Sequence, residues 1–150
     1  MTDFFQFEAE FVDSLRCIPM QVRCKLDTCG IKLKLSDWNQ MATDQRQVLV
    51  ELPCTTETEI QSYREYIQQL IIQRTGIPAT KLSIEPHPAW LDSAIVPASL
   101  QEKAQEIGVT LTQQDWTALT PLQRFALIKL SHPGHENKNF KRAIAEFHLL

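Results

Sequence analysis

The sequence has few of the residues that phosphate-binding loops and turn-rich β structures require. It contains only four glycines in 150 residues. Nucleotide-binding loops use closely spaced glycines, and neither G-x-x-x-x-G-K-[ST] nor G-x-G-x-x-G occurs. No serine stands in a G-x-S-x-G nucleophile elbow. Few glycines beside many Leu, Ile, Gln and Glu residues favour helices, so we predict an all-α fold.

Long apolar runs and a strong excess of one charge are also absent. No stretch approaches the roughly 20 apolar residues that a membrane-spanning helix needs. The first residues lack the basic and apolar parts of a signal peptide. The formal net charge is −3, which does not suggest a nucleic-acid binder. We therefore expect a cytoplasmic protein whose partners are neither membranes nor nucleic acids.

An internal repeat organises the chain. Residues 18–52 align with residues 96–130 without a gap, at an offset of 78, and ten of the 35 positions are identical. The identical pairs include Gly30/Gly108 and Trp38/Trp116, and apolar residues replace one another at many other positions. This matching indicates two copies of one helical unit.

Helix start and stop signals recur in both copies. Pro19 and Pro97 suit the first turn of a helix, where a missing N–H costs nothing. Gly30 and Gly108 suit the left-handed residue that ends this helix. Thr43 and Thr120 are predicted N-caps of a later helix, and Thr112 with Asp115 has the spacing of a capping box.

Each copy closes with another predicted helix. In the first copy, Thr56 and Glu59 form a capping box ahead of an apolar stripe. The stripe consists of Ile60, Tyr63, Ile67 and Leu70. In the second copy the helix runs from about Asn139 to Phe147 and carries Phe140 and Ile144 on the same face.

These patterns predict the domain organisation. We expect a single domain, residues 1–150, made of two helical repeats at about 18–75 and 96–150, related by a pseudo-twofold axis. A proline-rich connector, 76–97, joins them, and Trp90 within it is expected to fill the core. Any extended pairing is expected to be very short.

Two polar pairs recur at equivalent positions of the copies, Asp37 with Arg46 and Asp115 with Arg124. A single active centre needs only one copy, so recurrence favours an architectural role. We expect each arginine to bridge to the aspartate of its own copy and fix two helices.

The four cysteines lack the C-x-x-C pair with which many zinc and iron–sulfur sites begin. Cys17 and Cys29 align with isoleucines of the second copy, so we expect both in the core. Cys24 aligns with a glutamate and is expected at the surface. We predict no metal and no cofactor; the alternative is a metal site that uses Cys17, Cys29 and Cys54.

Several strings of the sequence are more specific than the helical pattern. They are FQFE at 5–8, LRCIPM at 15–20, KLDTCGIKL at 25–33, PC at 53–54, LQRFALIKL at 122–130 and HENKNF at 135–140. On these strings, essentially the whole chain resembles the nitrate reductase-associated protein family, which is known mainly from cyanobacteria.

The resemblance implies a non-catalytic accessory protein required for active assimilatory nitrate reductase, a molybdopterin and iron–sulfur enzyme that takes electrons from ferredoxin. Assembly factor, cofactor-insertion chaperone and bound subunit all agree with it, and nitrate reductase is the expected partner. The alternatives are a cysteine-based metal or iron–sulfur carrier in the same pathway and a small enzyme with an unrecognised site.

We predict the partner-binding face in the polar loop and helix start that follow Leu130. A duplicated protein that binds one partner breaks its symmetry somewhere, and loops on rigid helices are the usual place. The predicted face comprises His135, Glu136, Asn137, Lys138, Lys141 and Arg142. His132, His135 and Glu136 are also a possible metal-ligand set, but a loop that caps the last helix is the simpler interpretation.

Overall fold

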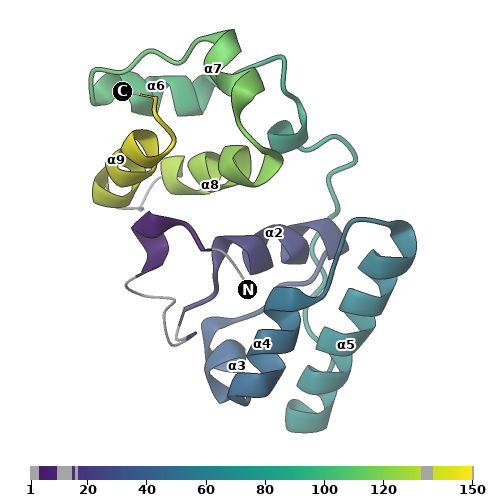
Figure 1. Cartoon of the computed structure of the whole chain (residues 1–150). Coiled ribbons are helices and arrows are strands. Elements are labelled where there is room, and N and C mark those ends of the chain that lie inside the picture. Colours follow the sequence, from purple (N-terminus) through teal and green to yellow (C-terminus); the bar gives the residue numbers. More distant parts are fainter. Residues whose placement is uncertain (1–3, 10–14, 16, 133–136, 150) are drawn as a thin grey trace. The chain divides into compact units, whose positions relative to one another are not determined.

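The computed structural model describes residues 4–9, 15, 17–132 and 137–149. This part of the chain contains eight α-helices, two 3₁₀ turns and no β-strand, which confirms the all-α prediction (Figure 1). The elements are η1 (Gln6–Glu8), α2 (Met20–Cys29), α3 (Leu35–Gln40), α4 (Thr43–Glu51), α5 (Glu57–Thr75), η2 (Ala89–Leu91), α6 (Ala98–Glu106), α7 (Gln113–Ala118), α8 (Pro121–Ser131) and α9 (Asn137–Glu146).

The chain divides into two compact units. The first unit comprises Met1–Phe4 and Ala9–Glu85, and the second comprises Phe5–Glu8 and Pro86–Leu150. The first unit therefore holds α2 to α5, and the second holds η1, η2 and α6 to α9. The predicted pseudo-twofold axis between the units stays a prediction.

The helices recur at the sequence offset of 78. Helices α2, α3 and α4 begin at residues 20, 35 and 43, and α6, α7 and α8 begin at residues 98, 113 and 121. Each pair of starting positions differs by 78. The helix that closes each unit differs in length, because α5 has 19 residues and α9 has 10.

A left-handed glycine follows the first helix of each unit, as the sequence predicts: Gly30 is the C-cap of α2, and Gly108 comes directly after Ile107, the C-cap of α6. Gly30 and Gly108 have φ of 74° and 80°, a left-handed conformation that side chains with a Cβ disfavour. In both units the residue after the glycine returns a backbone N–H to the helix. Ile31 donates to the Leu26 carbonyl at 3.1 Å, and the equivalent bond of the second unit is 2.9 Å long.

The helix starts agree with the sequence to within one residue. Pro19 and Pro97 are N-caps rather than first-turn residues. Thr120 is the N-cap of α8, as predicted, and accepts the Gln123 N–H at 3.1 Å. The prediction for Thr43 is wrong, because Ala42 takes the N-cap position of α4 and has no side-chain acceptor. Only the returning half of a capping box forms there, from the Ala42 N–H to a glutamine side chain.

Helix α5 closes the core of the first unit. Thr56 and Glu59 form the predicted capping box, with bonds of 2.9 and 3.2 Å. Tyr63 and Ile67 are fully buried, and the Tyr63 hydroxyl donates to the Leu49 carbonyl at 2.7 Å. The buried residues of this core include Val22, Leu26, Ile31, Trp38, Leu49, Val50 and Ile71.

A single antiparallel bridge, Ile31 with Lys81, joins the end of α2 to the segment after α5. The Lys32 N–H donates to the Thr80 carbonyl at 2.9 Å, and the Leu82 N–H donates to the Gly30 carbonyl at 2.8 Å. This agrees with the expectation of very short extended pairing.

The core of the second unit gathers on α8 and α9. Buried residues include Leu100, Trp116, Phe125, Leu127, Phe140, Ile144 and Phe147. The turn η1 packs on α9, where Phe5 lies edge-to-face with Phe147 at a centroid distance of 5.1 Å. The carboxylate of Glu146 accepts the N–H groups of Gln6 and Phe7, both at 3.0 Å. Trp90, on η2, is half-buried and meets the ring of Phe125 edge-on at 5.7 Å.

Among the residues that the structure describes, no helix combines the length and the apolar character that crossing a bilayer requires.

Candidate functional site

The cysteines all lie in the first unit, and their burial corrects two predictions. Cys29 is buried as expected, with 1% of its surface exposed. Cys17 is half-buried rather than fully buried, because Leu15 and Ile18 take the buried positions of the segment before α2. Cys24 is half-buried rather than exposed, so its alignment with a glutamate of the second copy is a poor guide. Across the described residues, no three His, Cys, Asp or Glu side chains are grouped so as to hold a metal ion.

Burial keeps three thiols protonated. It raises the pKa of Cys24 and of Cys29 to about 12 and the pKa of Cys54 to about 11. The Cys29 and Cys54 thiols lie near backbone carbonyls, those of Leu26 and Lys25, each at 3.7 Å. A thiol must lose its proton to attack a substrate or bind a metal. Without a bound cation, these three groups are therefore poor nucleophiles at neutral pH.

Lys25, which recurs as Lys103 in the second copy, is bound by the end of α4. Its ammonium donates to the carbonyls of Val50 and Leu52, both at 2.7 Å, and lies 5.7 Å from the ring centroid of Tyr63. Burial lowers its pKa. Cations stabilise the carbonyl end of a helix, so Lys25 fastens α2 to α4.

The recurring arginines do not bridge to the aspartates, so that prediction is wrong. Arg46 donates to the carbonyls of Leu15, Asn39 and Met41, at 3.0, 3.0 and 2.9 Å. Arg124 donates to the carbonyls of Trp90, Trp116 and Leu119, at 2.9, 3.2 and 3.0 Å. The guanidinium offers five N–H groups, and the short helices α3 and α7 leave C-terminal carbonyls that need donors. The role is architectural, as predicted, but the acceptors are backbone carbonyls.

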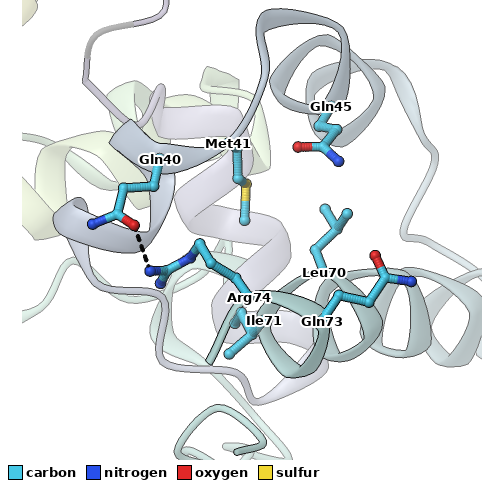
Figure 2. A pocket seen from close by; sticks show the side chains of 7 residues that line it. All are labelled: Gln40, Met41, Gln45, Leu70, Ile71, Gln73 and Arg74. Carbon is cyan, nitrogen blue, oxygen red and sulfur yellow. Dashed lines mark hydrogen bonds between the residues drawn. The ribbon is translucent and has the colours of Figure 1, made fainter. Parts of the chain in front are cut away.

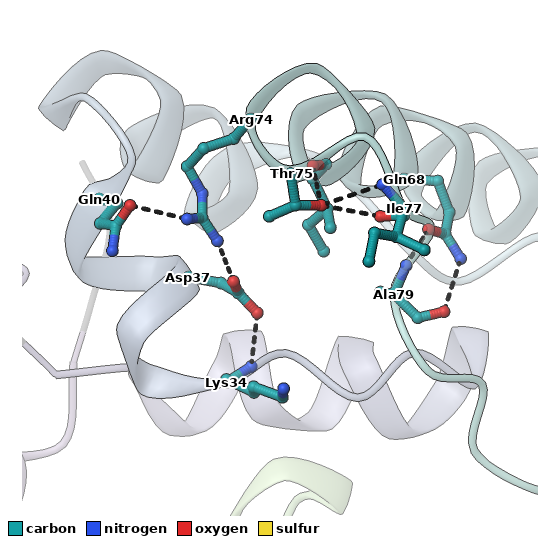
Figure 3. Close-up of polar contacts among 9 residues, drawn as sticks. Lys34, Asp37, Gln40, Gln68, Arg74, Thr75, Ile77 and Ala79 are labelled. Atoms are coloured by element: carbon teal, nitrogen blue, oxygen red, sulfur yellow. Dashed lines mark hydrogen bonds and ion pairs between the residues drawn. The ribbon is translucent and has the colours of Figure 1, made fainter.

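The two aspartates cap the short helices instead. Asp37 accepts the Lys34 N–H at 3.3 Å, and Asp115 accepts the Thr112 N–H at 3.1 Å. Asp37 has a second partner, because it forms an ion pair with Arg74 at the end of α5 (Figure 3). Arg74 also donates to the Gln40 side chain at 2.7 Å, so these contacts join α3 to α5.

The predicted partner-binding face lies partly outside the described residues. His135 and Glu136 are not described, and neither are the side chains of Asn137 and Lys138 at the start of α9. Lys141, one turn further along α9, is exposed, and Arg142 is half-buried. His132 is exposed and follows the last residue of α8, where its N–H donates to the Lys129 carbonyl. These residues stay a prediction.

The first unit contains a groove that sequence reasoning missed. It measures about 240 Å³ and lies between the α3–α4 junction and the last two turns of α5 (Figure 2). It is lined by Gln40, Met41, Gln45, Leu70, Ile71, Gln73 and Arg74. We refer to these seven residues as the α5 groove. The sequence signal for this groove is the helical pattern after Thr56, which is longer than the helical pattern that closes the second copy.

One comparison with known proteins identifies the family. The model of the conserved nitrate reductase-associated protein family matches residues 4–147. The chain belongs to this family. The match spans both units and the connector, so it concerns the whole fold and not one motif. The resemblance inferred from the sequence strings is thereby confirmed.

The family's description associates its members with nitrate reductase. Searches among curated proteins and among solved structures gave no match for this chain.

Proposed function

We propose that this chain is a non-catalytic accessory protein that binds nitrate reductase in the cytoplasm and is required for production of the active enzyme. The observation that carries the proposal is the family match over residues 4–147. Under this proposal the protein acts by protein–protein binding, as an assembly or cofactor-insertion chaperone or as a bound subunit.

The contacts of the reactive side chains support a binding role. Lys25, Arg46 and Arg124 direct their N–H groups at backbone carbonyls and hold helices together. Burial keeps the thiols of Cys24 and Cys29 protonated. Groups that a catalytic centre would draw on are thus engaged in the fold, which favours a scaffold whose surface performs the function.

We also infer that the two units arose by duplication of one helical unit. The ten sequence identities, the common offset of the helix starts and the paired arginine contacts support this. A duplicated scaffold that serves one partner has to differ between its copies at the contact. The length of α5 and the sequence just before α9 are two places where the copies differ.

Co-purification tests the proposal. A tagged chain should retain nitrate reductase from a lysate of its own cells, and cells that lack the chain should have low nitrate reductase activity. Molybdopterin and iron–sulfur content of the enzyme from those cells would separate the roles. Enzyme that is present but short of one cofactor indicates a cofactor-insertion chaperone, whereas enzyme that is fully loaded but inactive until the chain is added back indicates a subunit.

Two results would contradict the proposal. One is fully loaded and fully active nitrate reductase in cells without the chain. The other is failure of the tagged chain to retain either loaded or cofactor-free enzyme at low salt. A chain with an Ile67→Asp substitution in the core of α5 is the negative control, because it carries the same tag on a disrupted fold.

A further inference from the structure

The α5 groove exists because α5 is longer than its counterpart. Helix α5 has 19 residues and α9 has 10, so the last turns of α5, which we call the extension, exceed the length of α9. Helix α9 stops after Glu146, and His148 is left-handed with φ of 60°. Four of the seven lining residues lie in the extension, namely Leu70, Ile71, Gln73 and Arg74. The groove therefore depends on the extension of α5.

The floor of the groove is apolar. Met41 and Ile71 are 6% and 4% exposed, and Leu70 is half-buried. Figure 2 shows Met41 and Leu70 turned toward the same space. A cavity of about 150 Å³ holds a benzene molecule, so about 240 Å³ has room for a side chain the size of leucine or phenylalanine. Methionine adapts its shape to such a guest.

The charge at the groove is already balanced. Arg74 is the cation among the lining residues, and it pairs with Asp37 and donates to Gln40. Asp37 in turn is fixed by the Lys34 N–H at the start of α3 (Figure 3). An anionic ligand would have to displace a carboxylate that this network holds in place. The groove is thus suited to a neutral ligand, and a small anion such as nitrate is a poor candidate.

The rim offers amide groups to that ligand. The Gln45 side-chain oxygen accepts the Ala42 N–H at 2.9 Å, so the NH₂ group of the same side chain is the part that can bond to a ligand. Neither this NH₂ group nor the Gln73 carboxamide has a hydrogen-bond partner within the described part of the chain. Carboxamides of this kind match the carbonyl and N–H groups of a peptide main chain.

We propose that the α5 groove binds a short extended peptide segment of nitrate reductase. The segment inserts one neutral apolar side chain against Met41, Leu70 and Ile71, and its main-chain groups bond to Gln45 and Gln73. Apolar anchoring in a pocket with polar groups at its rim is the usual arrangement of an interaction hot spot. The inference rests on the proposed function and adds the docking site and the chemistry of the docked segment.

Two glutamines of α5 provide a matched test. Gln73→Glu places a carboxylate where main-chain carbonyls would approach, so the affinity for nitrate reductase should fall about tenfold. Gln69→Glu makes the same charge change at an exposed position of the same helix, outside the groove, and should bind like the unmodified chain. Equal affinities of the two variants would overturn the groove as the docking site.

A neutral fragment tests the groove without the partner. N-acetyl-leucine N′-methylamide carries one leucine side chain between two peptide groups. In methyl NMR spectra it should shift the signals of Met41, Leu70 and Ile71, and Leu70→Ala should reduce these shifts severalfold. Sodium nitrate at the same concentration should leave them in place. Shifts by nitrate alone, or fragment shifts only at other methyl groups, would overturn the proposal.

The two experiments separate failure of the groove from failure of the proposed function. If the unmodified chain retains nitrate reductase and Gln73→Glu retains it equally well, the groove is refuted and the accessory role stands. If the chain retains no nitrate reductase but the fragment binds at Met41 and Leu70, the accessory role is refuted. The groove then remains a peptide site for a different protein, and its assignment to nitrate reductase is overturned.

Discussion

Arg124 donates a hydrogen bond from Nη1 to the carbonyl oxygen of Leu119 at 3.0 Å, and Arg46 donates from Nη2 to the equivalent carbonyl of Met41 at 2.9 Å. Arg124 is 5% exposed, and its guanidinium lies 6.0 Å from the ring centroid of Trp116. A buried cation without enough acceptors is costly, and here the carbonyls at the end of α7 and the tryptophan ring stabilise the charge. In return, the guanidinium supplies the donors that those carbonyls need. This contact sets the turn between α7 and α8.

Replacing Arg124 should therefore reduce stability strongly. In Arg124→Lys the ammonium cannot reach all three carbonyls in the planar geometry of a guanidinium, and some of them lose their donor. The free energy of unfolding should fall by about 2–4 kcal/mol, measured by urea denaturation with circular dichroism. Arg46→Lys is the comparison. Arg46 is half-buried, and water can donate to the carbonyls that lose its N–H groups, so the loss of unfolding free energy should be smaller, about 1 kcal/mol. Equal losses would contradict this account.

The two helix-ending glycines offer a second matched pair. A Cβ on Gly30 would lie 2.7 Å from Ile84 Cγ1 and 2.9 Å from the Leu82 carbonyl oxygen, whereas a Cβ on Gly108 would meet nothing within 4 Å. Both residues are left-handed, so alanine at either position costs about 1–2 kcal/mol in backbone strain. Gly30→Ala should cost a further 1–3 kcal/mol or so, because the segment after α5 has to move away.

Thermal unfolding of the two variants measures this difference. Gly30→Ala should also lose protection of the Leu82 amide against hydrogen exchange, since this amide donates to the Gly30 carbonyl. Gly108→Ala should keep that protection. If both variants lose the same stability and the Leu82 amide stays protected in each, close contact at Gly30 has no energetic role.

The repeat made much of the fold predictable. Proline, glycine and threonine signals that occur twice restrict the helix boundaries more than one occurrence does, and the bounds of α2 and α6 followed to within a residue. Local rules work at these positions because a cap depends on residues close in sequence. The same logic failed for Thr43, where the second copy has threonine one position earlier and the first copy has Ala42.

The side-chain partners were not predictable in the same way. Opposite charges suggested an ion pair of Arg46 with Asp37, yet carbonyls released by the short helix α3 compete better for the guanidinium. Arg74, the actual partner of Asp37, lies 37 residues away on α5. The groove likewise depends on how far α5 extends past α3. Such contacts follow from tertiary packing, which a single sequence does not specify.

The raised thiol pKa values predict a loss of stability in alkali. The pKa values of Cys24, Cys29 and Cys54 lie above the ordinary value of 9.0 in the folded chain. Above pH 9 the unfolded chain therefore releases thiol protons that the folded chain keeps, so the unfolded state gains stability as pH rises. The contribution is fully present below pH 9 and is lost towards the folded pKa values of about 11 to 12.

Urea midpoints at pH 8, 9 and 10 check this prediction. The unmodified chain should lose stability from pH 9 to 10 more steeply than a chain with alanine at Cys24, Cys29 and Cys54. Lys25 acts in the opposite direction, because burial lowers its pKa. The Cys54 and Cys24 thiolates partly offset that lowering, so the alanine chain, which lacks them, should lose stability still less steeply. Val50→Ala truncates the core without removing a titrating group and should keep the steep slope. Identical slopes in all three chains would show that the thiols remain hydrated.

The loop before α9 provides the last prediction, which concerns the partner surface. Lys141 is exposed on α9, and Lys138 precedes it by one helical turn. The lysines belong to the predicted partner-binding face with His135, Glu136 and Asn137. If this face contacts nitrate reductase, Lys138→Glu with Lys141→Glu should weaken the association about tenfold at low salt, because reversed rim charges slow the encounter. The difference should shrink as salt is added. The helical signal and the melting temperature should stay nearly unchanged, since exposed charges contribute little to folding.

Lys32→Glu with Lys81→Glu applies the same charge change to exposed lysines of the first unit and is the matched control. A fall in affinity of the same size in both double variants would indicate only the effect of net charge. Unchanged binding of a folded Lys138 and Lys141 variant would exclude the loop and leave the α5 groove as the contact to test.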